Sequence, residues 1–474
     1  MKFRIEKDTL GSKKVPADAY YGIETVRAIE NFPVSGIKAH QRLIWATVAV
    51  KMAAAEANIT LGKLKKKIGK EIVRAAREVM EGRFMDQFAV DVFQAGAGTS
   101  HNMNANEVLA NRALEFLGKE KGEYSTVHPH DHVNMSQSTN DVFPTAMYIA
   151  ALSLTDELIP VLNSFKNALK TRSKEFHGIL KPGRTHLQDA VPIRLDQVFD
   201  AYASSIEKNI LSIEKAKDSL REVSLGGTAV GTGINTGPGY RKLVVERLSK
   251  ITSLYLRPAG DPVEATQNPT AVLILSGALR ELAVNLIKIA NDLRLLSSGP
   301  RTGIGEINLP PVQPGSSIMP GKVNPVMAEM INMVAFEVIG NDLTITMATQ
   351  ASQLELNVMM PLMAFNILQS LEILKNSIRV FTDRCISGIT ANPARCRELN
   401  EMSLGLATIL SPYIGYEASA EVAKEAFKSG KSVRDIILEK GILSKKKLGE
   451  ILDPFVVTGG KQTWFKGPRG QGLK

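Results

Sequence analysis

The stretch 275–296, LSGALRELAVNLIKIANDLRLL, decides the fold class. Leucine and isoleucine recur in it at alternating intervals of four and three residues, at positions 275, 279, 282, 286, 289, 293 and 296. This heptad rhythm is typical of a long helix that packs on other helices through one apolar stripe. We therefore interpret the stripe as a core or a bundle seam and not as a cofactor site.

Other long segments with few helix breakers extend the pattern along the chain, at 141–176, 190–222, 266–298, 325–350 and 352–386. Residues 1–140 mix turns with shorter helical patterns, such as those at 41–57 and 68–81. After the break at 389–393 (ITANP), shorter helices follow, and residues 458–474 form a basic, glycine-rich tail that we expect to be frayed. We predict a mainly α protein of three domains: 1–140, 141–394 with a long central helical bundle, and 395–474.

The composition excludes several classes of protein. With 474 residues, 44% of them hydrophobic and 22% charged, the chain is long enough for a large core and is neither disordered nor collagen-like. Two cysteines, Cys385 and Cys396, are too few for a disulfide framework and indicate a reducing compartment. Residues 1–16 lack the apolar core of a signal peptide, and no run of about 18 apolar residues suggests a membrane helix. We expect a cytoplasmic protein that contacts no membrane.

The net charge of +10 raises the question of nucleic-acid binding. The lysine runs at 65–67 and 445–447 are isolated, and no aromatic residues are interleaved with them as a stacking platform requires. We interpret these runs as solvated helix faces and expect no nucleic-acid partner. A positive field would also attract a small dianionic substrate.

Four short segments combine small residues with hydroxyl and amide side chains, in loops of the kind that carry function on rigid scaffolds. They are 96–107 (beginning GAGTS), 136–141 (SQSTND), 183–189 (GRTHLQD) and 315–325 (GSSIMPGKVNP), the last followed by Glu329. Each alone is weak evidence, because GAG at 96–98 lacks the strand of a dinucleotide fold and STND at 138–141 would serve as a helix N-cap. A lone His186 is likewise more often structural. The loop 225–233 (LGGTAVGTG) has a similar glycine-rich texture.

Together these segments hold the side chains that would bind a small dicarboxylate. Lys322 supplies a point charge, while serine, threonine and asparagine supply directed hydrogen bonds. The sequence contains no nucleophile elbow and no His-Glu-Xaa-Xaa-His spacing. Serine hydrolase and zinc chemistry are therefore not expected.

The segment 315–325, GSSIMPGKVNP, resembles the signature loop of the aspartase/fumarase superfamily. The other three segments are similar to the remaining active-site segments of that superfamily and follow in the expected order, so the resemblance covers residues 1–455. Six segments resemble its aspartase branch, the aspartate ammonia-lyases: AYYG at 19–22, RAIENF at 27–32, MDQF at 85–88, GAGTS at 96–100, STND at 138–141 and EINLP at 306–310. HP at 128–129, FPTAM at 143–147 and RTH at 184–186 resemble class II fumarases as much.

The resemblance implies reversible elimination of ammonia from L-aspartate to give fumarate, with no organic cofactor and no metal. One alternative is a class II fumarase, which differs in the leaving group. Another is a catalytically retired structural protein on the same fold, because a fold does not determine function. Against retirement, Ser316, Lys322, Asn324, His186 and Glu329 are all present.

The resemblance also implies roles for residues of this chain in binding substrate. The β-carboxylate would be held by Thr99, Ser138, Thr139 and Ser317. The α-carboxylate would be held by Thr185, Lys322 and Asn324. The amino group would be held by Asn140 and His186, with help from Thr99.

Ser316 would be the base that removes the proton from Cβ, which gives a doubly charged aci-carboxylate intermediate. Backbone N–H donors near Gly315 and Gly321 would stabilise its alkoxide once the loop closes and excludes water. Glu329 would form a hydrogen bond with His186 and fix its tautomer or keep it protonated.

Assembly is also expected. A helix of about 30 residues spans about 45 Å, and the segments near 99, 139, 186 and 316 lie at the ends of long helices. We therefore do not expect one chain to bring all four segments together. We expect the apolar stripe at 275–296 to face outward and pack on partner chains. The resemblance implies a D2 homotetramer in which each active site draws on three chains.

Overall fold

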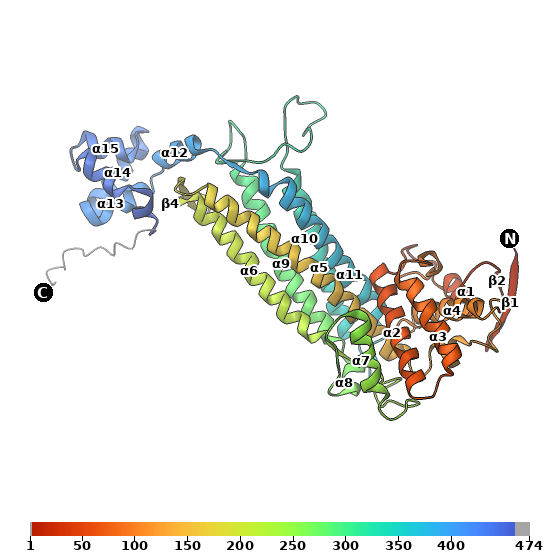
Figure 1. Ribbon diagram of the computed structural model, residues 1–474. Coiled ribbons are helices and arrows are strands. Elements are labelled where there is room, and N and C mark those ends of the chain that lie inside the picture. Colours follow the sequence, from red (N-terminus) through yellow and green to blue (C-terminus); the bar gives the residue numbers. More distant parts are fainter. Residues whose placement is uncertain (1, 460–474) are drawn as a thin grey trace. The chain divides into compact units, whose positions relative to one another are not determined.

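The structure is a computed structural model that describes residues 2–459, so the predicted tail lies, from residue 460 on, outside the described residues (Figure 1). The chain is mainly helical, as predicted. Its five long helices are α5 (Thr139–Glu175), α6 (Leu195–Ser219), α9 (Thr270–Leu296), α10 (Val326–Gln350) and α11 (Met360–Arg384). The helices that precede α5 are α1 (Ile23–Asn31), α2 (Gln41–Thr60), α3 (Lys66–Met80), the 3-10 helix η1 (Met85–Gln87), α4 (Thr99–Phe116) and the π-helix η2 (Pro129–Val133).

Shorter helices complete the chain between and after the long ones. They are α7 (Tyr240–Thr252), α8 (Pro262–Gln267), the 3-10 helix η3 (Ile386–Gly388), α12 (Pro393–Met402), α13 (Leu406–Ile414), α14 (Tyr416–Ser429), α15 (Val433–Glu439), α16 (Lys445–Ile451) and α17 (Pro454–Val457).

The strands form four two-stranded sheets. Antiparallel pairs join β1 (Phe3–Asp8) to β2 (Gly11–Pro16), β3 (Leu180–Thr185) to β4 (Gln188–Arg194), and β7 (Ile307–Asn308) to β8 (Thr390–Ala391). One parallel pair joins β5 (Glu222–Val223) to β6 (Arg257–Pro258). The β3–β4 hairpin carries Thr185 and His186, two of the predicted site residues.

The chain divides into two compact units whose boundaries all fall inside the five long helices. Unit 1 is Met1–Val161, Asn209–Val284 and Met333–Asn376, and unit 2 is Leu162–Lys208, Asn285–Asn332 and Ser377–Lys474. One cluster of buried apolar side chains, drawn from residues 44–133, forms a core of unit 1. A second cluster, drawn from residues 406–451, lies in unit 2. The division into three domains at 140 and 394 stays a prediction.

The apolar stripe of α9 faces inward, so the expectation that it faces outward is wrong. Leu275, Leu282, Leu286 and Leu293 have no exposed surface. A different stripe is exposed on α10, where Met333, Phe336, Leu343 and Met347 are 54–66% exposed. These four positions, with Gly340 between them, repeat the heptad spacing. The exposed apolar stripe is therefore on α10, in unit 1.

Two predicted helical segments, 190–222 and 352–386, begin later in the structure than the sequence predicted. Residues 190–194 belong to strand β4, and residues 352–359 form a loop before α11. The buried Asn357 explains this loop, because its Nδ2 donates to the carbonyls of Ala348 and Thr349 at 3.0 and 3.1 Å. These carbonyls are in the last turn of α10, where the helix supplies no donor four residues on, so the Asn357 amide caps the end of the helix.

Helices α5 and α9 are long and apolar enough to cross a membrane by length and composition alone. In the structure, 67% and 44% of their most apolar stretches are buried inside the protein. Core helices of a water-exposed bundle have the same composition, so these two helices are weak evidence for a membrane.

Candidate active site

Thr99 lies at the start of α4, where a glycine-rich turn opens the helix. Gly98 has a φ of 94°, and a Cβ there would come within 2.2 Å of the Phe143 ring, so only glycine fits. The exposed Thr99 places its Oγ1 2.7 Å from the Gly96 carbonyl and 3.3 Å from Thr139 Oγ1. The turn thus brings two predicted substrate-binding hydroxyls together.

The remaining predicted residues of unit 1 lie at the start of α5. Ser138 Oγ accepts the backbone N–H of Asn140 at 3.2 Å, and the amide Nδ2 of Asn140 donates to the Ala229 carbonyl at 2.7 Å. Thr139 and Thr99 are each the first residue of a helix. Helix N-termini favour anions, so this corner is suited to a carboxylate.

A buried lysine that the sequence analysis missed lies behind these hydroxyls. Lys51 of α2 is fully buried, and its Nζ donates to Asn134 Oδ1 at 2.8 Å. Asn102 Nδ2 lies 3.3 Å from the same oxygen and 3.1 Å from Thr139 Oγ1, which joins Lys51 to the site. Burial lowers the pKa of Lys51 to about 7. The only signal in the sequence is a charge inside the apolar run 48–55 (VAVKMAAA).

The β3–β4 hairpin carries Thr185 at the end of β3 and His186 in its two-residue turn. His186 and Leu187 have φ values of 53° and 60°, and both are exposed. A turn with two left-handed residues normally uses Asn-Gly, and other residues there cost of the order of ~1–3 kcal/mol each. Such strain concentrates at functional sites, which supports a functional role for His186.

A buried ion cluster that the sequence analysis also missed underlies this hairpin. Glu306 is fully buried, and its carboxylate lies 3.1 Å from Lys181 Nζ and 2.8 Å from Arg184 Nη1. Lys181 and Arg184 belong to β3, so Glu306 fixes the strand that ends at Thr185. Leaving one of these charges without its partner would be strongly destabilising.

The signature loop closes on itself at Gly315. The N–H of Gly315 donates to the Lys322 carbonyl at 2.7 Å, and Asn324 Nδ2 donates to the Gly315 carbonyl at 2.6 Å. Within the loop, Ser316 Oγ accepts the N–H groups of Ile318 at 3.2 Å and Met319 at 3.0 Å. Donors to Ser316 were expected near Gly315 and Gly321, and the structure places them instead at residues 318 and 319.

Most side chains of the loop are open to solvent. Ser317 and Lys322 are exposed, and Ile318 is 84% exposed. Among the described residues, Lys322 Nζ has no carboxylate within ion-pair distance. A free cation on an exposed loop is available for an anionic ligand.

The expected hydrogen bond between His186 and Glu329 is not formed within the chain. Glu329 Oε1 instead lies 4.0 Å from Arg294 Nη2. Among residues 2–459, the histidines that pair with carboxylates are His40, His128, His130 and His177, so the exposed His186 forms no ion pair within its own chain. His186 therefore keeps its hydrogen-bonding capacity for another partner, and Glu329 is held only by this long ion pair.

The predicted site residues fall into two groups, one in each unit. Unit 1 contains Thr99, Ser138, Thr139 and Asn140. Unit 2 contains Thr185, His186, Ser316, Ser317, Lys322, Asn324 and Glu329. In the part of the chain that the structure describes, no group of three or more His, Cys, Asp and Glu side chains is arranged to hold a metal ion.

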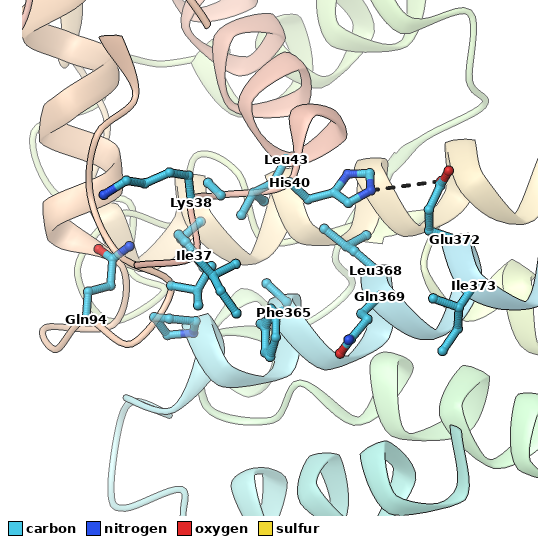
Figure 2. Close-up of a pocket in the computed structure, with 15 residues that line it drawn as sticks. Ile37, Lys38, His40, Leu43, Gln94, Phe365, Leu368, Gln369, Glu372 and Ile373 are labelled. Atoms are coloured by element: carbon cyan, nitrogen blue, oxygen red, sulfur yellow. Dashed lines mark ion pairs between the residues drawn. The ribbon is translucent and has the colours of Figure 1, made fainter. Parts of the chain in front are cut away.

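Unit 1 also contains an apolar cavity of about 200 Å³ (Figure 2). Ile37, Leu43, Phe365 and Leu368 line it, and His40 Nε2 lies 3.9 Å from Glu372 at its edge. Burial lowers the pKa of His40. None of the predicted site residues lines this cavity.

Comparison with known proteins identifies the family of this chain. A family model described as "Lyase" matches residues 11–340, and one described as "Fumarase C C-terminus" matches residues 406–459. The chain therefore belongs to the lyase family, and the predicted membership of the aspartase/fumarase superfamily is confirmed.

The similar proteins include members of the aspartase branch of the superfamily. Aspartate ammonia-lyases of Bacillus subtilis and Pseudomonas aeruginosa are 52% and 53% identical, over 96% and 95% of this chain and 96% of each relative. The Escherichia coli aspartate ammonia-lyase is 48% identical over 94% of both chains.

A fumarate lyase:delta crystallin from Brucella melitensis bound to cobalt superposes with a TM-score of 0.93 at 49% identity, over 96% of this chain and 99% of that one. A class II fumarase from Schistosoma mansoni gives 0.92 at 38% identity, over 96% and 98%. The fold is thus that of the superfamily along nearly the whole chain.

Proposed function

We propose that this chain is an aspartate ammonia-lyase, which converts L-aspartate reversibly to fumarate and ammonia. The observation that carries the proposal is full-length similarity to bacterial aspartate ammonia-lyases at 48–53% identity, against 38% for the class II fumarase structure. The intact set of site side chains argues against a catalytically retired protein.

Residues of both groups bind the substrate in this proposal. Thr99, Ser138, Thr139 and Ser317 hold the β-carboxylate, and the first three of these lie at the N-terminal ends of α4 and α5. Lys322, Asn324 and Thr185 hold the α-carboxylate. Asn140 donates through Nδ2 to Ala229, which supports an orientation that offers Oδ1 to the substrate's ammonium group.

Ser316 acts as the base in this proposal. Its Oγ takes the proton from Cβ, and the electron pair of that C–H bond moves into the β-carboxylate to give the aci-carboxylate. The Ile318 and Met319 N–H groups support this role because they stabilise negative charge on Oγ. Such preorganised donors are each worth of the order of ~3 kcal/mol. The intermediate then collapses to fumarate as the C–N bond breaks, with His186 and Asn140 beside the departing ammonia.

We propose a cytoplasmic homotetramer whose active sites each draw on three chains. The exposed apolar heptad on α10 supports the assembly, since bundle helices associate through such stripes. His186 and Glu329, which do not pair within a chain, would pair between chains.

The test is to follow fumarate absorbance with L-aspartate and, separately, with L-malate. We expect turnover of aspartate and little turnover of malate at matched concentrations. Malate turnover above that of aspartate would favour the class II fumarase, and turnover of neither would favour a retired protein.

A further inference from the structure

Asp141 joins two segments of unit 1 through its two carboxylate oxygens. Its side chain is fully buried, and Oδ1 accepts the N–H of Ser138 at 2.9 Å, which closes a capping box at the start of α5. Oδ2 accepts the N–H groups of Gly226 at 2.9 Å and Thr228 at 3.0 Å. The same carboxylate therefore anchors the start of α5 and the glycine-rich loop 225–233.

One residue after Thr228, the loop 225–233 contacts the candidate site at Asn140. Gly226 and Thr228 have φ values of 91° and 57°, a conformation that a non-glycine residue such as Thr228 adopts only when its surroundings hold it. The next residue, Ala229, accepts the amide Nδ2 of Asn140 at 2.7 Å. Asp141 thus fixes the loop backbone, and the loop fixes the Asn140 amide.

We propose that Asp141 is a positioning residue that, through the loop 225–233, orients the Asn140 amide so that its oxygen faces the substrate's amino group. The inference rests on the proposed function, in which Asn140 binds that group. Asp141 itself touches no substrate in this scheme. Its contribution is to keep Asn140 from rotating and presenting its NH₂ group to an ammonium ion.

The charge of Asp141 should make this positioning dependent on pH. Burial raises the pKa of Asp141 to about 6, against three backbone N–H donors and the nearby Lys51 of α2 that lower it. Tyr240 of α7 also interacts with this carboxyl, and burial holds the pKa of Tyr240 well above its usual value. Below about pH 6 the carboxyl gains a proton and becomes a weaker acceptor for the loop N–H groups. The KM for aspartate should therefore rise as pH falls through about 6.

The experiment compares Asp141→Asn with wild-type enzyme in steady-state kinetics on L-aspartate between pH 5 and 8. An asparagine turns an NH₂ group toward N–H donors, so the loop loses its anchor. We expect KM to rise at least tenfold at pH 7.5 with kcat changed less than threefold, and the rise in KM below pH 6 to disappear. Asp91→Asn is the matched control, because Asp91 also accepts three backbone N–H groups, those of Ser35, Gly36 and Phe93. It should lower thermal stability and leave KM unchanged.

A second comparison tests whether Asp141 acts through Asn140. The Asn140→Ala/Asp141→Asn double variant should have the KM of Asn140→Ala alone, because the two changes remove one interaction. Additive increases in KM, or an unchanged KM in Asp141→Asn, overturn the inference. A wild-type KM that is constant from pH 7 to pH 5 overturns it too, and that measurement needs no variant. Failure of the proposed function is distinct, because the wild type would then not convert aspartate at all.

Discussion

Ser316 combines two properties that a serine base needs: it lies on an open loop, and its oxygen already receives two backbone N–H groups. Removing the hydroxyl in Ser316→Ala should lower kcat by about 10²–10⁴-fold, the usual contribution of a general base. Binding of aspartate, measured by calorimetry, should change little because the other site residues remain.

Ser444→Ala is the matched control for this change. Ser444 Oγ also accepts the backbone N–H of the residue three positions on, Lys447, at 3.2 Å, and it lies at the start of α16, outside the candidate site. Its loss should leave kcat intact. A fall in kcat of about tenfold or less in Ser316→Ala, which is at most about 1.4 kcal/mol of barrier, would exclude Ser316 as the sole base and make His186 the next candidate.

Lys322 is a free cation at the base of the same loop. Lys322→Met should weaken aspartate binding by roughly 2–5 kcal/mol, because a substrate carboxylate then enters the closed site without its counter-charge. Calorimetric titration measures this loss directly. Lys445→Met, which removes another exposed lysine, should bind aspartate normally. Equal affinity in Lys322→Met and wild type would show that another group holds the carboxylate.

Among the elements, the signature loop depends on a glycine where its two ends meet. A Cβ at Gly315 would lie 2.6 Å from the Lys322 carbonyl oxygen and 2.7 Å from the Asn324 nitrogen. Gly315→Ala should therefore open the loop and reduce kcat/KM by more than tenfold, with little change in Tm because the loop is largely exposed. Kinetics and calorimetry of the same sample measure both effects.

Gly277→Ala provides the control, since a Cβ at this position in α9 meets no atom within 4 Å. It should keep full activity and raise stability by roughly 0.5–1 kcal/mol, the helix preference of alanine over glycine. Full activity in Gly315→Ala would show that catalysis does not require the two ends of the signature loop to meet at residue 315.

The elements also show what sequence can predict. The heptad of 275–296 and the apolar spacing of the other long segments predicted α5, α6, α9, α10 and α11 because helix periodicity is local. The side that each helix exposes was not predictable in this way. The stripe of α9 is buried and that of α10 is exposed, although both are apolar, because burial depends on which neighbours cover a face.

The same limit applies to the candidate site. Hydroxyls, amides and Lys322 were found because they cluster in short motifs. Asp141 was visible only as a possible cap, since its second role depends on a loop 85 residues further along the chain. Lys51 and Glu306 are buried beside the candidate site residues, and their partners Asn134 and Arg184 lie 83 and 122 residues away in sequence.

At the scale of the whole molecule, assembly and activity should be lost together. Met333, Phe336, Leu343 and Met347 expose an apolar heptad on α10, and large exposed apolar patches mark interaction surfaces. Phe336, 58% exposed in the single chain, is the one aromatic residue among these four. Phe336→Asp puts a charge into the seam, so we expect light scattering to show species smaller than four 51.6 kDa chains. If each active site draws on three chains, aspartate turnover should fall in proportion to the lost tetramer.

The matched control is Phe427→Asp on α14, where the phenylalanine is 78% exposed and lies outside the α10 stripe. It introduces the same charge and should leave both mass and turnover unchanged. Circular dichroism of Phe336→Asp should retain its helical signal, since that side chain is not part of the core of its own chain. An active wild-type species at the monomer mass would contradict shared active sites, because a single chain would then be sufficient for catalysis. An active Phe336→Asp tetramer would show that the subunit interface does not involve α10. The exposed heptad on α10 would then bind another partner.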